Sequence, residues 1–227
     1  MLHTDFRPNK TVRWHACALL LLLSAWVAPS AFADTDHMDR DRDYRGHAAG
    51  PVLPATARPF GISLTDAASL TGVFNQTDHS GPVPAIAPRI QMLYTTATNA
   101  FTVGRGDVLY VPLVWNNNVP EIIGDFPTNP RSRRQLLNYW FSQSQFGVTA
   151  MDFRVDGRLT TLGGGNLVQV ELPPTADTSP LYYQTAAAYI AGLRPGEHTI
   201  ALHFRATGDA LRRTNVAQYF PDGVFEF

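Results

Sequence analysis

The residues best suited to chemistry gather in one stretch of the chain, the connection from Trp115 to Trp140. Its candidate ligand-binding residues are Trp115, Asn116, Asn118, Glu121, Asp125, Arg131 and Trp140. A flat aromatic ring covers the apolar face of a sugar, while planar amide and carboxylate groups hydrogen-bond its hydroxyls. We therefore predict a binding site here, for a glycan or another envelope component. The alternative is that both tryptophans pack in the core while the polar residues only solvate a loop.

Acidic residues in and beyond this stretch raise the possibility of glycan hydrolysis. That reaction uses two carboxyl groups about 5–10 Å apart in one cleft. The candidates are Glu121, Asp125, Asp152 and Glu171. Their spacing along the chain does not fix their separation in space, so the sequence assigns no catalytic residue. A third possibility is a structural or partner-binding secreted protein, because aromatic residues gather at positions 219–227.

Several other chemistries lack the residues that they need. Cys17, the only cysteine, lies near the start of the chain, and Lys10 is the only lysine. Both residues lie in an N-terminal segment whose removal is predicted below. Thiol chemistry and Schiff-base chemistry are therefore not expected of the mature chain. No His-Glu-x-x-His, EF-hand or phosphate-loop pattern occurs in the sequence. The sequence predicts neither a metal site nor a cofactor.

The N-terminal segment has the pattern of a secretory signal peptide. Arg7, Lys10 and Arg13 precede an apolar run at 16–28, and Ala31 and Ala33 supply the small residues of a cleavage site. The run of about thirteen residues is shorter than the roughly 20 that span a bilayer. We predict cleavage of residues 1–33 near Ala33/Asp34 and a mature protein that is periplasmic or secreted, with no membrane span.

The charge of the mature chain disfavours nucleic acid as a partner. The leader carries three of the eighteen Lys and Arg residues and one of the nineteen Asp and Glu residues. The mature chain therefore has a net charge near −3. Nucleic-acid binding rewards a concentrated basic surface, which this balance does not favour.

The pattern of apolar and turn residues along the chain predicts that a β-rich domain positions these candidate residues. Residues 34–58 alternate charges and then become proline-rich, which predicts a disordered linker. The domain is expected over 59–227, where short apolar segments alternate with turn residues. The expected strands are Arg89–Thr95, Ala100–Val103, Val108–Trp115, Val148–Val155, Asn166–Leu172, Ala186–Gly192, Glu197–Arg205 and Gly223–Phe227. One short helix is expected at Asn129–Tyr139, with Pro130 in its first turn.

Alternation within the strands indicates how they pack. Met151, Phe153 and Val155 share one face of their strand, opposite Asp152 and Arg154. Ile200, Leu202 and Phe204 likewise share one face of a later strand. Such half-apolar strands predict an all-β fold, a two-sheet antiparallel sandwich of jelly-roll or immunoglobulin-like topology.

Two motifs resemble a family of exported bacterial proteins without assigned function. Residues 106–116, Gly-Asp-Val-Leu-Tyr-Val-Pro-Leu-Val-Trp-Asn, resemble its "G-x-x-L-x-x-P" strand. Residues 192–200, Gly-Leu-Arg-Pro-Gly-Glu-His-Thr-Ile, resemble its "L-x-P-G-x-H-T-I" strand start. The likeness covers about residues 100–206. It implies a secreted β-sandwich with no known activity, and Asn117–Phe141 departs from the family pattern.

Overall fold

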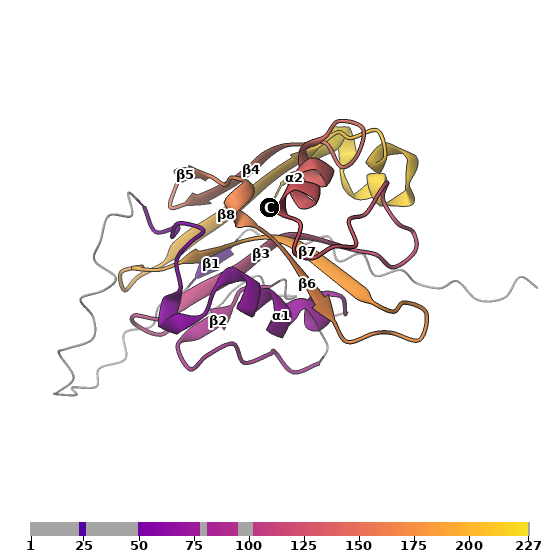
Figure 1. Ribbon diagram of the computed structural model, residues 1–227. Coiled ribbons are helices and arrows are strands. Elements are labelled where there is room, and N and C mark those ends of the chain that lie inside the picture. The colour runs from indigo at the N-terminus through magenta and orange to yellow at the C-terminus, as the bar shows by residue number, and fades with distance from the viewer. Residues whose placement is uncertain (1–22, 26–49, 78–80, 95–101, 227) are drawn as a thin grey trace, which may run out of the picture.

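The computed structural model of the protein describes residues 23–25, 50–77, 81–94 and 102–226. Within them, the strands form two sheets (Figure 1). Sheet A contains β1 (Leu23–Ala25), β4 (Val148–Val155), β5 (Arg158–Thr161), β8 (His198–Ala206) and β9 (Val224–Glu226). Sheet B contains β2 (Ile90–Met92), β3 (Val108–Asn117), β6 (Leu167–Leu172) and β7 (Leu181–Ile190). The α-helices are α1 (Leu64–Asn75) and α2 (Arg133–Phe141). The 3-10 helices are Pro59–Gly61, Gly164–Asn166, Leu211–Arg213, Asn215–Tyr219 and Pro221–Gly223.

The pairing within each sheet is mostly antiparallel. In sheet A, β8 lies beside β4, which pairs with β5, and β1 and β9 pair with two different parts of β8. In sheet B the order is β2-β3-β7-β6, and only β2 and β3 run parallel. Pro112 has no N–H for a ladder, and the register of β3 against β7 shifts just after it. The predicted mostly β architecture of two sheets is thus confirmed.

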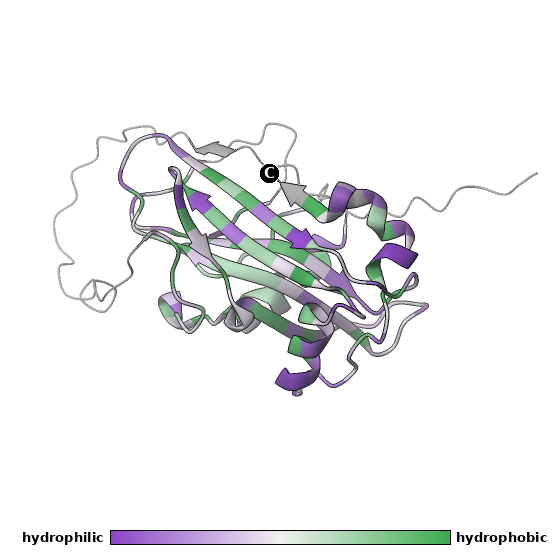
Figure 2. Ribbon diagram, turned by 90° about the horizontal axis from the view of Figure 1, so that it is seen from above, coloured by the Kyte–Doolittle hydropathy of each residue, from purple (hydrophilic) through white to green (hydrophobic). Residues whose placement is uncertain are grey.

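The main core lies between the two sheets. Met151, Phe153 and Val155 of β4 enter it from sheet A. Leu109 and Val111 of β3 enter it from sheet B. The alternation of apolar and polar residues along the strands is visible from above (Figure 2). The predicted inward faces of β4 and β8 are therefore confirmed.

A second core cluster lies on the other face of sheet B, where α1 covers it (Figure 1). Ala67 and Ala68 of α1 are fully buried, and Tyr110 and Tyr189 of the sheet pack in the same cluster. Gly72 lets the helix approach closely, because a Cβ there would lie 2.9 Å from Leu172 Cδ1. With both faces covered, β3 and β7 are buried along nearly their whole length.

The helices differ most from the sequence-based expectation. There are two α-helices among the described residues rather than one, because α1 was not predicted. The predicted helix at Asn129–Tyr139 is α2, which begins later, with Ser132 as the N-cap that accepts a hydrogen bond from the Gln135 N–H. Pro130 lies before that cap and not in the first helical turn.

Most of the predicted strands are confirmed, but several of their boundaries differ from the prediction. The observed β4 has the predicted bounds, and β2, β3, β6, β8 and β9 overlap their predictions. The strand β7 begins five residues before the predicted Ala186, and β5 was not predicted. Residues 102–103 of the predicted Ala100–Val103 strand are not in a strand, while 100–101 lie outside the described residues.

The predicted linker at 34–58 is ordered in its last part. Val52 is buried and forms a bridge with Ile190 at the end of β7. The Leu53 N–H donates to the Tyr189 carbonyl at 2.8 Å, and the Ala191 N–H donates to the Pro51 carbonyl at 2.8 Å. The prediction of disorder was wrong for 50–58. Backbone hydrogen bonds to the end of β7 order this segment, and its composition did not indicate them. Residues 34–49 lie outside the described residues. Within the part that the structure describes, no helix is long and apolar enough to cross a membrane.

Candidate functional site

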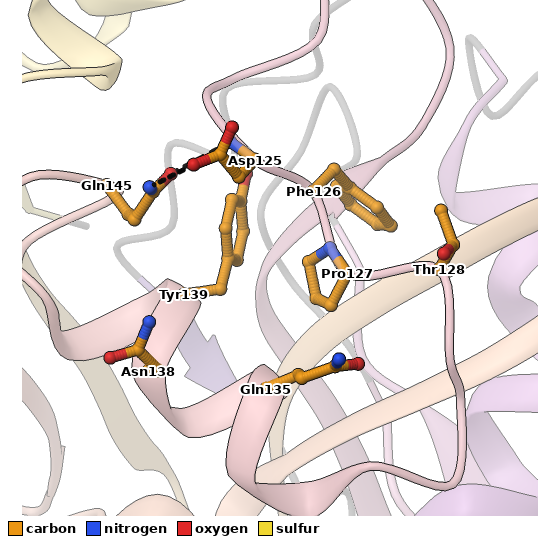
Figure 3. Close-up of a pocket in the computed structure, with 8 residues that line it drawn as sticks. All are labelled: Asp125, Phe126, Pro127, Thr128, Gln135, Asn138, Tyr139 and Gln145. Carbon is orange, nitrogen blue, oxygen red and sulfur yellow. Dashed lines mark hydrogen bonds between the residues drawn. The ribbon is translucent and has the colours of Figure 1, made fainter.

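A pocket of about 310 Å³ opens beside α2 and is the candidate functional site (Figure 3). One wall is the segment 125–128, and another is the face of α2 that carries Gln135, Asn138 and Tyr139. These three residues share that face because residues three and four positions apart are neighbours on a helix. Gln145, which follows α2, completes the lining.

Asp125 and Gln145 hold each other at the rim of the pocket (Figure 3). The Gln145 Nε2 donates to Asp125 Oδ2 at 2.8 Å. The Asp125 backbone N–H donates back to Gln145 Oε1 at 2.8 Å. Two bonds between the same pair of residues tie the segment 125–128 to the chain that follows α2.

Three polar side chains in the lining remain available to a ligand. Thr128, Gln135 and Asn138 are exposed, and their side chains make no hydrogen bond among the described residues. Together they offer a hydroxyl and two planar amides, so each can donate and accept. The site can therefore form several hydrogen bonds with a small polar molecule.

The apolar part of the pocket is built from Phe126, Pro127 and Tyr139, which are all buried. The Phe126 and Tyr139 rings meet edge to face, with centroids 5.5 Å apart. The Tyr139 hydroxyl donates to the Ile123 carbonyl at 2.8 Å and accepts from Asn116 Nδ2 at 2.6 Å. Burial raises the pKa of Tyr139 well above its ordinary value, against a smaller lowering by the Asn116 bond, so this hydroxyl stays neutral.

Of the seven predicted ligand-binding residues, only Asp125 lines this pocket. Trp140 is fully buried, stacks on Phe146 and donates its indole N–H to Gln184 Oε1 at 2.6 Å. The expectation of an exposed ring at this position was wrong. Its apolar surface and its single N–H both find partners inside the core.

Trp115 lies on a different face of sheet B from Trp140. It is partly buried against the cluster under α1, and it stacks on Tyr183 with ring centroids 6.2 Å apart. Asn116, the next residue in β3, is 9% exposed and turns toward Tyr139. Adjacent residues of a strand point to opposite faces, so one ligand cannot contact both side chains on one face.

The remaining predicted binding residues have structural partners or lie exposed outside the pocket. Asn118 donates to the Pro180 carbonyl at 2.9 Å and accepts from the Tyr182 N–H at 2.7 Å. Glu121 is exposed and accepts from the Asn215 N–H at 3.0 Å. Arg131 is exposed, and its backbone N–H donates to Asn129 Oδ1.

The four carboxylates considered for hydrolysis lie in different surroundings. Asp152, in sheet A, accepts from Thr161 at 2.7 Å and contacts His203 Nδ1 at 3.0 Å. Glu171 is exposed on β6 of sheet B. Asp125 is the only one of the four that lines the described pocket. Among the described residues, no group of three or more His, Cys, Asp and Glu side chains is placed to hold a metal ion.

The sequence did not predict several of the residues that line the pocket. Pro127, Thr128, Gln135, Asn138 and Gln145 were not among the predicted ligand-binding residues. The spacing of Gln135 and Asn138 on one face of the predicted helix was a usable signal. Gln145 carried none, because only the turn after α2 brings it back to Asp125.

Comparisons with known proteins gave no relatives for this chain. No family model matches it, no curated protein matches it, and no solved structure matches its fold.

Proposed function

We propose that this chain is an exported binding protein whose pocket beside α2 takes a sugar or a similar polyhydroxylated molecule. The observation that carries the proposal is the pocket lining. In it, Thr128, Gln135 and Asn138, whose side chains bond to no other described residue, adjoin the buried Phe126 and Pro127. Planar amides and hydroxyls match the alternating donors and acceptors of a sugar ring. An apolar wall matches its C–H face.

The charge of the lining favours a neutral or amino-bearing ligand over an acidic one. Asp125 is the one acidic side chain in the lining, which contains no basic side chain, and its side-chain partner, Gln145, is uncharged. A ligand carboxylate nearby would be repelled, and an ammonium attracted. At a separation of about 4–6 Å and an effective dielectric constant of about 60–80, one such charge changes the affinity by about threefold to tenfold.

Binding is proposed here rather than glycan hydrolysis. Glycoside hydrolysis ordinarily requires a second carboxyl group about 5–10 Å from the first. Asp125 is the only carboxylate in the pocket lining, and it is tied to Gln145 at the rim. These surroundings support recognition of a ligand and do not supply the acid–base pair of that reaction.

The proposal includes export and the finer fold. We infer that residues 1–33, which include the short β1 strand at the edge of sheet A, are removed and that the mature protein acts in the periplasm or outside the cell. We also infer a sandwich in the family of exported bacterial proteins that the two motifs resemble. The shared core of sheets A and B supports the sandwich. The mass of the protein recovered from the cell envelope or medium tests the export, and an N-terminus near Asp34 is the expected result.

The binding proposal is tested with a glycan array followed by titration calorimetry. We expect the wild-type protein to bind at least one neutral or amino sugar. The double variant Gln135→Ala, Asn138→Ala should bind it about tenfold more weakly, because it loses hydrogen bonds worth about 0.5–1.5 kcal/mol each. The matched control is Arg134→Ala, an exposed position on α2 that is not part of the lining, and its affinity should match that of the wild type.

The charge preference is tested separately with Asp125→Asn. This change removes the negative charge and keeps an oxygen that can accept from Gln145. The variant should lose the preference for amino over acidic sugars while it still binds neutral ones. A wild-type protein that binds no glycan would contradict the proposal, as would a double variant that binds as well as the wild type.

A further inference from the structure

A row of three buried amides crosses sheet B next to the pocket. Asn116 of β3 pairs in register with Gln184 of β7, which pairs in register with Gln169 of β6. The three side chains are 9%, 0% and 7% exposed. We call Asn116, Gln184 and Gln169 the amide row. None of the three lines the pocket.

Gln184 and Gln169 connect α2 to the pocket wall through one chain of hydrogen bonds. The Trp140 indole of α2 donates to Gln184 Oε1 at 2.6 Å. Gln184 Nε2 donates to Gln169 Oε1 at 3.1 Å, and Gln169 Nε2 donates to the Pro127 carbonyl at 2.8 Å. Pro127 is in the pocket lining, so the chain ends on the wall itself.

Asn116 begins a second, shorter chain, which ends on Ile123, two residues before the same wall. Its Nδ2 donates to the Tyr139 hydroxyl at 2.6 Å, and that hydroxyl donates to the Ile123 carbonyl at 2.8 Å. The segment from Ile123 to Pro127 is therefore held at both ends by side chains that start on sheet B.

Buried amides are a costly way to fill a core. An amide without a hydrogen bond in an apolar interior destabilises the folded protein, while apolar side chains of similar volume fill space without that requirement. Unlike apolar side chains, the amides of the row hold specific atoms in place, because each hydrogen bond fixes the position of one carbonyl or hydroxyl. Binding sites gain affinity when their walls are already held in the bound geometry.

We propose that Gln169, Gln184 and Asn116 are positioning residues that hold the segment 123–127, whose residues 125–127 belong to the pocket wall, in place for the ligand. Gln169 bonds the wall directly, Gln184 orients Gln169, and Asn116 acts through Tyr139. Loss of Gln169 frees the wall at Pro127. The effect on affinity rests on the proposed function, whereas the effect on the order of the wall does not.

The test uses NMR order parameters of the backbone amides, measured on the full chain without ligand. In Gln169→Leu, we expect the order parameters of residues 123–129 to fall from the rigid range near 0.85 to below about 0.6. Those of β4 and β8 should not change. If the wild-type protein binds a sugar, the same variant should bind it about tenfold more weakly.

The matched control is Asn75→Leu. Asn75 is also a buried amide, and it donates to the Tyr183 hydroxyl at 2.7 Å on the face of sheet B that α1 covers. This variant removes a comparable bond away from the pocket, so it should leave the order parameters of 123–129 unchanged. A mobile wall in both variants would show a general loss of stability and would overturn the proposal.

Tyr139→Phe provides a second route if Gln169→Leu does not fold. It removes one oxygen atom and with it the bond to the Ile123 carbonyl, so residues 123–125 should become mobile. A folded Gln169→Leu or Tyr139→Phe protein with a rigid wall would overturn the proposal. A wild-type protein that binds no sugar would overturn the proposed function alone, because the order of the wall is measured without ligand.

Discussion

His198, at the start of β8, lies between two acceptors. Its Nδ1 is 2.7 Å from Asp156 Oδ2, and its Nε2 is 2.6 Å from the Arg194 carbonyl oxygen. A carbonyl only accepts, and so does an ionised carboxylate, so both ring nitrogens must carry hydrogen to satisfy the site. Burial on its own lowers the pKa of His198, but the bonds to Arg194 and Asp156 outweigh it and raise the pKa above 6.5.

This arrangement predicts a stability that falls as the pH rises from about 6.5. A histidine whose pKa is raised in the folded state stabilises it fully below the unfolded pKa and stops doing so above the folded pKa. Asp156 has a lowered pKa, because the His198 and Thr199 bonds outweigh its burial, so its contribution is lost only in acid, below about pH 4. Urea unfolding of the wild type should give a lower free energy of unfolding at pH 8 than at pH 5.5. In His198→Gln, the part of this decrease that comes from His198 should be absent. An equal pH dependence in the two proteins would contradict the prediction.

Tyr110 predicts a stabilising substitution. Its hydroxyl is buried and makes no hydrogen bond of ordinary geometry among the described residues, and the neighbouring Thr71 hydroxyl donates to the Ala67 carbonyl. Burial raises the pKa of Tyr110 well above its ordinary value, and Thr71 lowers it by a smaller amount. Tyr110→Phe removes an unsatisfied polar group, so the free energy of unfolding should rise by about 1 kcal/mol. The contrast is Tyr183→Phe, which leaves Asn75 without its acceptor and should lower that energy by about 1–2 kcal/mol. The free energy of unfolding of both variants is measured by chemical denaturation. If it fell equally in both, the Tyr110 hydroxyl would have a hydrogen-bond partner.

At the scale of single elements, α1 depends on its first turn. Ser63 Oγ accepts from the Asp66 N–H at 3.1 Å, and Asp66 Oδ2 accepts from the Ser63 N–H at 2.8 Å. The Ser63 bonds also lower the pKa of Asp66. This reciprocal capping box satisfies N–H groups that a helix leaves unpaired at its start.

Removal of the cap should weaken α1 measurably. Ser63→Ala should lower the free energy of unfolding by about 1 kcal/mol in chemical denaturation. Ser69→Ala is the matched control, since Ser69 lies on the same helix, is exposed and donates only to the Thr65 carbonyl. It should stay within about 0.5 kcal/mol of the wild type. If the two serine variants were equally stable, the cap would have no special role.

At the scale of the whole molecule, sheet B joins the two core clusters. Leu109 and Val111 of β3 pack toward sheet A, while Val108 and Tyr110 of the same strand pack toward α1. Loss of one cluster therefore exposes a face of the sheet on which the other depends. We expect the described part of the chain, apart from the short β1 strand, to unfold as one cooperative unit.

Calorimetry of a variant in the second cluster tests this cooperativity. Leu64→Ala in α1 should cost about 2–5 kcal/mol. At about 2–4 °C per kcal/mol for a chain of this size, the whole endotherm should move to lower temperature without splitting. A separate early transition, with the rest of the endotherm at its wild-type temperature, would show that α1 and its cluster unfold independently.

The sequence by itself determined the features that depend on local pattern. Alternation with a period of two predicted β4 with its correct bounds and identified its inward residues, because adjacent side chains of a strand face opposite sides. The Ser63-Leu64-Thr65-Asp66 pattern also carried the capping box that marks the start of α1. That signal was missed because the helix presents small residues such as Ala67 and Ala68 to the sheet, and not a stripe of large apolar side chains.

Only the tertiary structure decided the composition of the pocket and the direction of each aromatic ring. Trp115 and Trp140 look equivalent in the sequence, but they pack on opposite faces of sheet B. Gln169 and Gln184 are polar residues within apolar strands, a visible anomaly whose meaning depends on which strands are neighbours. Strand order and the return of Gln145 to Asp125 arise from contacts between residues far apart in the chain. Local pattern fixes which face of an element is apolar, whereas the partner of that face is set by packing of the whole molecule.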